Sequence, residues 1–374
     1  MPSTREAQLR HASHYMRVLR DADEFYRQGG ASSSRGLQLF NVEWTNIQVA
    51  QERLAEYSDL DETANDCWSE YPRGGSYLLN LRQNPRDRIR WLSSALAAAR
   101  RLNHKDAESS HLNNLGLSYA RIGETRKAIE FYEQDLIVTR EIQDKRGEAI
   151  ALGNLGIAYK NLGKLGHAVD CLEDALKIDR EINDTRNIGL DLDGLAVVYA
   201  AAGRSEEAIG LHQQALSIFR EIGDRQWEAN TLGNLGFSYS ALGNHSQAVE
   251  FYKQDLVISR EIGDVRGENI TLTRLAMSYA ALGEYKRALE FYEHAIALVR
   301  QVGNRRGEAD VMWHMSLTLD KLGRRTEALP LAQLALELYT AIEDPNAERV
   351  RALIIQWSGN CLHENDLIAI IEAP

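Results

Sequence analysis

Apolar and small residues recur every forty positions along most of the chain. In residues 227–266 the recurring positions include Gly236, Tyr239 and Gly243. Steps of forty from Tyr239 reach tyrosines at 119, 159, 199 and 279, and steps from Gly243 reach glycines at 123, 163, 203, 283 and 323. Six copies fit residues 107–346 without a gap. A period kept this strictly predicts a stacked array of repeats rather than a globular enzyme domain.

Each copy predicts two helices that fold back on one another. Leu232, Leu235 and Tyr239 are spaced as one apolar face of a helix. Gly243 stands where a helix C-terminus favours a left-handed residue, and Asp264 stands where it can cap the next helix. Small residues at 116, 156, 196, 236, 276 and 316 would let the two helices approach closely. Because neither helix can bury its apolar face alone, we expect an all-α, right-handed superhelical solenoid whose first helices line a concave wall.

The pattern Leu235-Gly236-x-x-Tyr239, followed by Ala248 and Tyr252, resembles the tetratricopeptide repeat (TPR). Repeats of that family are usually about 34 residues long, so six more residues lengthen the second helix and its exit here. The forty-residue form, with NLG in the first helix and REIGD at the end, resembles Pins-type adaptors and many bacterial TPR proteins. The resemblance covers residues 85–346. It implies a binding scaffold and, by itself, no ligand.

The chain departs from the TPR pattern at two kinds of position. Proline is absent from its usual place after the second helix, and Asp135 and Asp255 stand where a small residue is usual. Both aspartates fall on the apolar stripe of a second helix. A buried acid can mark a functional site, but it more often forms an ion pair with a neighbouring Arg or Lys. We therefore expect ion pairs at these two positions, and the sequence leaves their role open.

Residues 1–58 form an N-terminal helical pair that lies outside the repeats. The pattern predicts helices over 3–28 and 35–57, separated by a break from Gly29 to Ser34. This pair resembles the helical region that joins the nucleotide-binding half of bacterial STAND-type signalling ATPases to a C-terminal TPR sensor. The apolar positions of its second helix are Leu39, Val42, Trp44, Ile47 and Leu54.

Two further segments flank the six repeats at 107–346. We expect residues 59–106 to form a degenerate repeat, because Pro72 and two glycines interrupt its first half. We expect residues 347–374 to form a capping helix and a short apolar tail, and the sequence does not tell whether that tail occupies a groove. Terminal repeats of an array are expected to be atypical because their outer face meets water.

Charge and cysteine content narrow the functional class. The formal net charge is −11, with acids and bases interspersed, which argues against nucleic acid as a main partner. The three cysteines are far apart and form no CxxC pair, so we expect a reducing compartment and no zinc site. The N-terminus has no apolar signal core and no segment is long enough for a membrane span, so we expect a cytoplasmic protein with no membrane contact. The oligomeric state cannot be derived from the sequence.

Motifs for catalysis are missing from the sequence. The pair Gly163-Lys164 lacks the upstream glycine of a phosphate loop and recurs as a turn between helices. HExxH and GxSxG do not occur, and no nucleophile–base pair is suggested. We therefore expect no enzyme activity, no catalytic residue, no metal and no cofactor.

The first helix of each repeat also carries a pattern on the face opposite its core stripe. One column across the repeats is rich in amides that can bond an extended peptide backbone, and another is apolar. The first comprises Asn114, Asn154, Asn234, Arg274 and His314, with glycine at 194. The second comprises Leu117, Ile157, Val197, Phe237, Met277 and Leu317, and Trp313 adds an aromatic ring at the C-terminal end. Packing between neighbouring first helices would explain part of this pattern, and a peptide-binding groove would explain the remainder.

The sequence thus supports three functional hypotheses. The first is a non-enzymatic scaffold that binds a peptide or protein segment in the concave groove. The second is the ligand-sensing arm of a STAND-like signalling ATPase, in which case this chain is part of a larger signalling system. The third is a peptide-responsive regulator that acts through its N-terminal helices. The identity of the ligand does not follow from the residues.

Overall fold

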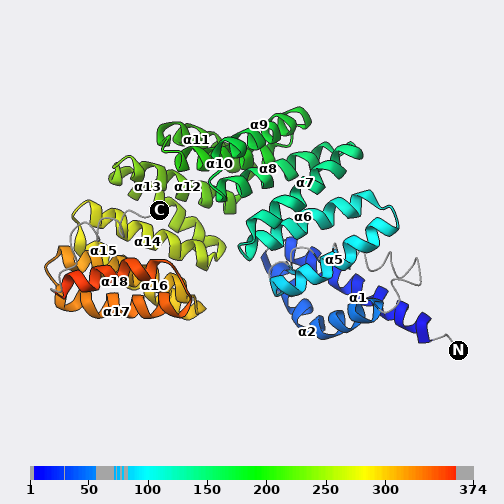
Figure 1. Cartoon of the computed structure of the whole chain (residues 1–374), viewed down its shortest axis with the longest axis horizontal. Coiled ribbons are helices and arrows are strands. Elements are labelled where there is room, and N and C mark those ends of the chain that lie inside the picture. The colour runs from blue at the N-terminus through cyan, green and yellow to red at the C-terminus, as the bar shows by residue number, and fades with distance from the viewer. Residues whose placement is uncertain are drawn as a thin grey trace. The chain divides into compact units, whose positions relative to one another are not determined.

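The computed structural model describes residues 4–28, 30–55, 71–72, 74–75, 78–79 and 83–358. The described residues form sixteen helices and contain no strand (Figure 1). The fold is therefore all-α, as the sequence predicts. The chain divides into two compact units, residues 1–198 and residues 199–374, which we describe separately.

The first unit holds the N-terminal pair and the first repeats. Its helices are α1 (Thr4–Arg27), α2 (Gly30–Ala55), α5 (Pro85–Arg101), α6 (Lys105–Arg121), α7 (Thr125–Glu141), α8 (Lys145–Asn161), α9 (Leu165–Ile182) and most of α10 (Thr185–Ala201). Within this unit α1 packs on α2, and each helix from α5 to α8 packs on the next one along the chain. Contacts between neighbours in sequence dominate, as expected of a repeat array.

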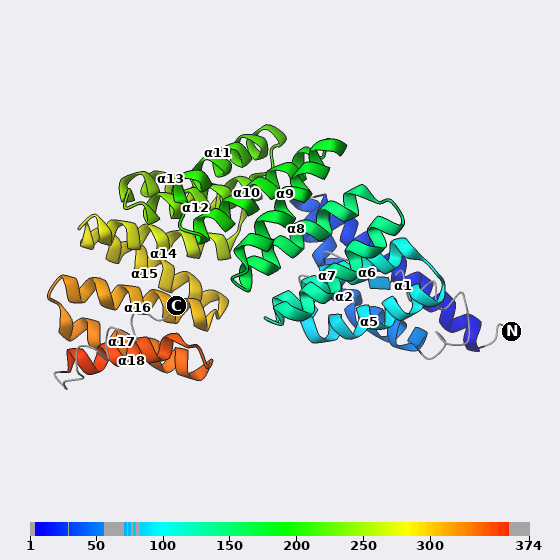
Figure 2. The ribbon, with the colours of Figure 1, turned by 45° about the horizontal axis from the view of Figure 1, so that its top comes forward.

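The second unit continues the same arrangement. Its helices are α11 (Ser205–Ile222), α12 (Arg225–Ala241), α13 (His245–Ile262), α14 (Val265–Ala281), α15 (Tyr285–Val302), α16 (Arg305–Lys321), α17 (Arg325–Ala341) and α18 (Asn346–Trp357). The helices from α14 to α18 follow one another as a stack of neighbouring rods (Figure 2). The first helix α14 also contacts the first helices α12 and α16 directly.

Glycines and aspartates end and begin the helices where the sequence places them. Gly243, between α12 and α13, has a φ of 75°, and Gly263, after α13, has a φ of 71°. The Asp264 side chain accepts a hydrogen bond from the backbone N–H of Gly267 at 2.9 Å, which caps α14. These observations confirm the predicted turn and cap, which satisfy backbone groups that the helix ends leave unpaired.

The small residue in the first helix makes room for a ring from the second. A Cβ atom added to Gly236 would lie 2.5 Å from the Tyr252 ring, which is itself almost fully buried. Next to it, the rings of Tyr239 and Phe251 stack with centroids 5.2 Å apart. The expected close approach within the hairpin is therefore real, and it brings an aromatic ring onto the backbone of the first helix.

The N-terminal pair differs from its prediction at two points. The predicted break from Gly29 to Ser34 is wrong for Gly30–Ser34, because α2 already begins at Gly30. The Ser33 hydroxyl donates to the Tyr26 carbonyl at 2.7 Å, so packing against α1 holds this serine-rich turn in a helix. Val42, expected on the apolar stripe, is 69% exposed, whereas Phe40 is buried. The stripe that α2 buries contains Phe40, Ile47, Ala50 and Leu54.

Parts of three sequence predictions lie outside the described residues. They are the first half of the degenerate repeat, from 59 to 70, the apolar tail from 361 to 374, and Cys67 and Cys361. The Cys171 thiol, which is described, is unpaired and half-buried. None of the described helices is both long and apolar enough to cross a membrane.

Candidate functional site

The apolar column on the first helices is partly open to solvent. Phe237 on α12 is 51% exposed and Met277 on α14 is 42% exposed. Ile157 on α8, in the first unit, is 38% exposed. Phe237 and Met277 belong to neighbouring first helices of the second unit, and large apolar side chains exposed close together are typical of a surface that a partner covers. We call the exposed face of α12, α14 and α16, with Phe237, Ile270 and Met277, the first-helix wall of the second unit.

Other members of the apolar column are less exposed. Leu117, Val197 and Leu317 are half-buried. Leu117 packs against the core cluster that contains Tyr132. Trp313 packs against the cluster that contains Tyr339, so its ring supports the contact between α16 and α17. The apolar column thus contains both exposed side chains, such as Phe237 and Met277, and side chains that pack inside the array, such as Leu117.

Two members of the amide column link neighbouring first helices. The Asn154 amide donates to the Asn113 Oδ1 at 2.7 Å, which joins α8 to α6. At the same register position in a later repeat, the Arg274 guanidinium links α14 to α12, where it donates to the Gly233 carbonyl at 3.3 Å. Asn114 donates within its own helix to the Ser110 carbonyl at 2.8 Å, and Asn234 is half-buried on α12. The links made by Asn154 and Arg274 therefore help to set the spacing of the first helices in the free protein.

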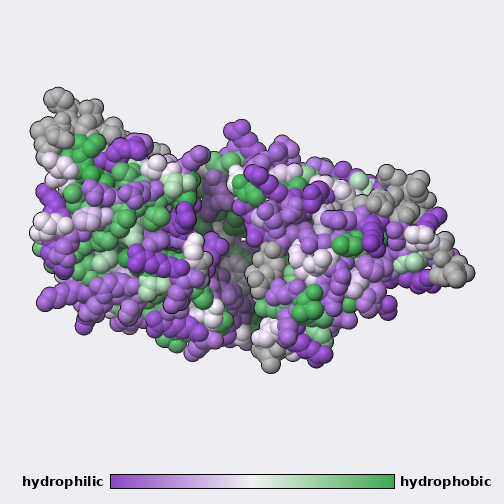
Figure 3. Space-filling view, turned by 90° about the horizontal axis from the view of Figure 1, so that it is seen from below, coloured by the Kyte–Doolittle hydropathy of each residue, from purple (hydrophilic) through white to green (hydrophobic). Residues whose placement is uncertain are grey.

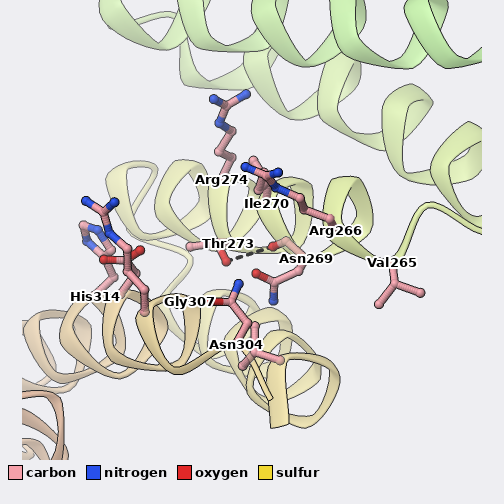
Figure 4. A pocket seen from close by; sticks show the side chains of 12 residues that line it. Val265, Arg266, Asn269, Ile270, Thr273, Arg274, Asn304, Gly307 and His314 are labelled. Carbon is pink, nitrogen blue, oxygen red and sulfur yellow. Dashed lines mark hydrogen bonds between the residues drawn. The ribbon is translucent and has the colours of Figure 1, made fainter. Parts of the chain in front are cut away.

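A cavity of about 900 Å³ opens between α14 and α16 in the second unit. Figure 4 shows the side chains that line it, with Arg274 pointing from α14 toward α12, where it donates to the Gly233 carbonyl. Its volume is in the range of ligand pockets in proteins. The lining residues are Val265, Arg266, Asn269, Ile270, Thr273, Arg274, Val299, Asn304, Arg306, Gly307, Asp310 and His314.

The cavity contains more positive than negative side chains. Arg266 and Arg274 come from α14 and Arg306 from α16, whereas Asp310 is the one acid among the lining residues. The Tyr339 hydroxyl donates to one carboxylate oxygen of Asp310 at 2.5 Å. Burial lowers the pKa of His314, and the nearby Asp310 charge opposes this shift. The predicted residues Arg274 and His314 therefore meet in one site, and sequence reasoning missed Arg266.

A second, smaller cavity in the first unit is acidic. It has a volume of about 450 Å³ and is lined by Asp106, Asp135, Asp144 and Arg146, among others. The Ser109 hydroxyl donates to Asp135 at 2.6 Å. Burial raises the pKa of Asp135 to about 7, although the bond from Ser109 acts in the opposite direction. The described residues thus do not form the expected ion pair at Asp135, and a hydroxyl takes the place of a cation.

Asp255 is also held by hydroxyl groups. Thr271 donates to it at 2.5 Å and Ser259 at 2.9 Å. Burial raises its pKa, while these hydrogen bonds and the charge of Arg274 act against the shift. The expectation of an ion pair is therefore wrong here as well, since the described residues contain no salt bridge to Asp255. Neither aspartate belongs to a metal-binding cluster, because the described part of the chain holds no group of three or more His, Cys, Asp or Glu side chains of that kind.

The surface of the molecule carries apolar areas among many charged residues. On the face seen in Figure 3, hydrophobic residues gather most densely in the part of the picture that holds the C-terminal helices. Ile270 and Val265, which line the larger cavity, are 40% and 38% exposed. The second unit therefore combines exposed apolar side chains with a cavity of positive charge.

Solved structures with the same fold come from several signalling systems. One is a STAND protein with a tetratricopeptide repeat sensor from Pyrococcus horikoshii, with 17% identity and a TM-score of 0.60 over 92% of this chain, which spans 52% of that one. Another is the apo form of the quorum sensor NprR from B. thuringiensis, at 18% identity and a TM-score of 0.55, covering 90% of this chain and 97% of that one. A third is aspartyl phosphate phosphatase F from Bacillus subtilis, at 14% identity and a TM-score of 0.58, covering 96% and 94%. At these identities the likeness concerns the fold.

Family comparisons agree with the repeat pattern. A search of curated proteins gives no match. Three family models, each described as Tetratricopeptide repeat, match residues 112–146, 149–182, 190–256 and 268–341, together more than half of the chain. The matched residues overlap every first helix from α8 to α16, and the candidate site depends on three of these. The chain belongs to the tetratricopeptide repeat family.

Proposed function

We propose that this protein is a non-enzymatic scaffold that binds a peptide or protein segment on the first-helix wall of its second unit. The observation that carries the proposal is the exposure of Phe237 and Met277, with the Phe237 ring 5.6 Å from the guanidinium of Arg274, which lines the cavity between α14 and α16. Large apolar residues left in water cost free energy that a partner can recover, at roughly 25 cal/mol per Å² of apolar surface buried. Aromatic and arginine side chains are the usual centres of such interfaces.

The wall offers two kinds of contact to one ligand. Phe237, Ile270 and Met277 can bury apolar side chains of a bound segment. The cavity next to them supplies the guanidinium groups of Arg266 and Arg274. A short peptide can reach both, because α12 and α14 are in direct contact. The arrangement suits a peptide with apolar and polar residues in one extended stretch.

Paired substitutions of exposed apolar residues test this proposal. Replacing Phe237 and Met277 by alanine should weaken binding of a partner captured from source lysate by at least about tenfold, the effect of about 1.4 kcal/mol. The matched control replaces Ile137 and Val257, which are 66% and 56% exposed on the second helices α7 and α13. Titration of the captured partner against each variant measures the affinity, and melting curves check that the variants remain folded. Equal affinities for both double variants would mean that the wall is not the binding surface.

A second candidate is the ligand-sensing arm of a larger signalling system. It is favoured by the likeness to the sensor-bearing STAND protein, which extends over 92% of this chain and includes more than the repeats. In that case a nucleotide-binding protein encoded beside this chain should co-purify with it. Its ATP hydrolysis should respond to this chain and lose the response in the Phe237/Met277 variant. Magnesium ATP alone should leave the melting temperature of this chain unchanged.

The third candidate is a peptide-responsive regulator whose output is the α1–α2 pair. It is favoured by the likeness to a quorum sensor and to an aspartyl phosphate phosphatase, since each alignment covers 90% or more of this chain. Here peptide binding in the second unit should change the hydrogen exchange of α1 and α2. Exchange in α1 and α2 that is identical with and without bound peptide would contradict this candidate and leave the scaffold proposal intact.

A further inference from the structure

An Arg–Asp ion pair recurs between consecutive repeats, and it determines which arginines of the larger cavity already have an acidic partner. The Arg146 Nε lies 3.2 Å from the Asp184 carboxylate, which stands before the first helix of the following repeat. The Arg306 Nε lies 3.0 Å from the Asp344 carboxylate. In both cases the acid stands 38 residues after the arginine. In these two repeats the arginine at this register position thus forms an ion pair with the aspartate that precedes the first helix of the next repeat.

Arg266 occupies the same register position and lacks this partner. The residue 38 positions later is Asn304, whose side chain caps α16 by accepting from the Gly307 N–H at 3.0 Å. One repeat earlier, Gln226 donates to Asp264 at 3.0 Å, so there the acid is present and the cation is absent. Within the described residues, no acidic side chain pairs with Arg266. Its side chain is exposed and lines the cavity.

Arg274 adds a second cation to the same cavity. Its guanidinium donates to the Gly233 carbonyl and lies 5.6 Å from the centre of the Phe237 ring. A guanidinium has five N–H donors, so one bond to a carbonyl leaves donors for a ligand. Asp255 also interacts with Arg274 through charge, and its two carboxylate oxygens accept hydrogen bonds from Ser259 and Thr271.

We propose that the cavity between α14 and α16 selects acidic peptide segments, with Glu or Asp side chains of the ligand bound by Arg266 and by Arg274. This inference rests on the proposed peptide-binding function and names its ligand class. Guanidinium groups bind carboxylates through paired, charge-assisted hydrogen bonds. Ile270 and Val265 beside Arg266 are exposed enough to contact apolar residues of the same segment. These apolar neighbours, together with the net charge of −11 of the whole chain, favour a peptide over a nucleic acid.

Selection from a random peptide library displayed on phage tests the ligand class and does not require the natural partner to be identified. The wild-type protein should enrich peptides that combine Glu or Asp with apolar residues. The best peptide is then synthesised with an amidated C-terminus, so that only side-chain carboxylates remain, and with its acids replaced by glutamine. We expect the glutamine form to bind about tenfold more weakly, as for the loss of a hydrogen bond to a charged group. The preference should shrink as salt rises.

Three variants locate the effect in the cavity. Arg266→Gln should remove most of the preference for the acidic form of the peptide. Asn304→Asp should do the same while keeping the arginine, because it restores the acid that other repeats carry and retains the cap of α16. Arg146→Gln, at the same register position in another repeat, is the matched control and should leave the preference unchanged. Melting curves check that every variant is folded.

The outcomes separate this inference from the proposed function. Enriched peptides without acidic residues, or equal binding of the acidic and glutamine forms, would overturn the acidic class and leave peptide binding standing. A full preference retained in both Arg266→Gln and Asn304→Asp would also overturn it. Failure of the wild-type protein to enrich any peptide above an empty support would overturn the inference and count against the proposed function as well.

Discussion

At the scale of single residues, glycines in the first helices leave the space that aromatic rings of the second helices fill. Gly236 has the Tyr252 ring where its Cβ would be, and Gly116 has the Tyr132 ring in the same place. A side chain added at either position must displace a buried aromatic ring of the partner helix. Small residues at this register position therefore preserve the packing inside the hairpin rather than the flexibility of the chain.

Gly236→Ala should destabilise the protein by about 1–3 kcal/mol, because one added carbon overpacks the contact with Tyr252. The control is Gly210→Ala on α11, where an added Cβ meets nothing within 4 Å. That change should stabilise the helix by about 0.5–1 kcal/mol through the reduced freedom of the unfolded chain. Chemical denaturation measures both. Equal effects of the two substitutions would show that the ring does not limit the space at Gly236.

Asp135 should make stability depend on pH. Its pKa is raised to about 7 in the folded protein, mainly by burial, against about 3.9 in an unfolded chain. The folded state thus keeps a proton that the unfolded state loses, so this residue makes stability fall as pH rises from about 4 to about 7. Asp135→Asn should gain stability relative to the wild type over that window. A difference between the two proteins that stays constant from about pH 4 to about pH 8 would contradict the raised pKa.

The partners of the buried aspartates could not be derived from the sequence. Periodicity placed Asp135 and Asp255 on the buried stripe, and both are buried. Their partners, Ser109 and Thr271, lie 26 and 16 residues away on different helices. Which polar groups meet depends on the rotation of each helix about its axis, and a pattern of apolar residues leaves that rotation undetermined within a turn. The general preference for an ion pair therefore gave the wrong partner.

At the scale of helices, the connections between repeats follow one scheme with two kinds of turn residue. The second helices end at a left-handed residue, which is Gly at 223, 263 and 303 and a larger residue elsewhere. Next to this turn an arginine of one repeat pairs with a glutamate of the next, as Arg260 does with Glu268 at 2.7 Å. Such half-exposed pairs contribute about 0.2–1 kcal/mol each, so the turn and the buried stripe matter more for stability.

Gln143→Gly should stabilise the protein by up to about 1 kcal/mol. Gln143 has a φ of 59°, which costs an L-residue about 1–2 kcal/mol, and glycine avoids this cost at a smaller loss of entropy. The reverse change, Gly263→Gln, places the same residue in the equivalent turn and should destabilise by a similar amount. Thermal unfolding of the two variants tests the pair together. Shifts of the same sign would show that the left-handed turn does not decide the outcome.

Helix positions were predictable wherever the forty-residue register held, and less so outside it. Turn residues such as Gly243 and caps such as Asp264 mark the repeats in the sequence itself. In the N-terminal pair no register exists, and local propensity suggested a break at the serines before Gly36. The packing of α2 on α1 overrides that propensity. The two helices approach closely at Gly36, where an added Cβ would lie 2.5 Å from the Ala22 carbonyl. The missing acidic partner of Arg266 can be predicted from the sequence, but only by noting that the residue 38 positions later is Asn304 rather than an aspartate.

At the scale of the whole molecule, stability should be distributed over neighbouring helices rather than concentrated in one core. Separate core clusters occur along the chain, such as one that contains Tyr252 and Tyr292 and another that contains Met312 and Tyr339. Each of these clusters draws on consecutive hairpins. An array of this kind gains stability from each added neighbour contact.

Shortening the chain from its C-terminus should therefore lower stability in steps. A chain ended after Gly303 loses α16, α17 and α18 but keeps every contact among α11 to α15. It should remain helical by circular dichroism and unfold at a lower temperature than the full chain. A chain ended after Gly263 should unfold lower still. Complete loss of helical signal in the first of these would contradict a nearest-neighbour array.

The binding face is the central claim, and cross-linking from two matched positions tests it most directly. A photoreactive phenylalanine analogue at 237 or at 257 places the same probe on α12 or on α13, at sites where Phe237 and Val257 are 51% and 56% exposed. Each protein is irradiated with the same library-selected peptide, and the adducts are identified by mass spectrometry. We expect the peptide to be attached at 237 and not at 257. Attachment at 257 alone, or equally at both positions, would contradict binding on the first-helix wall.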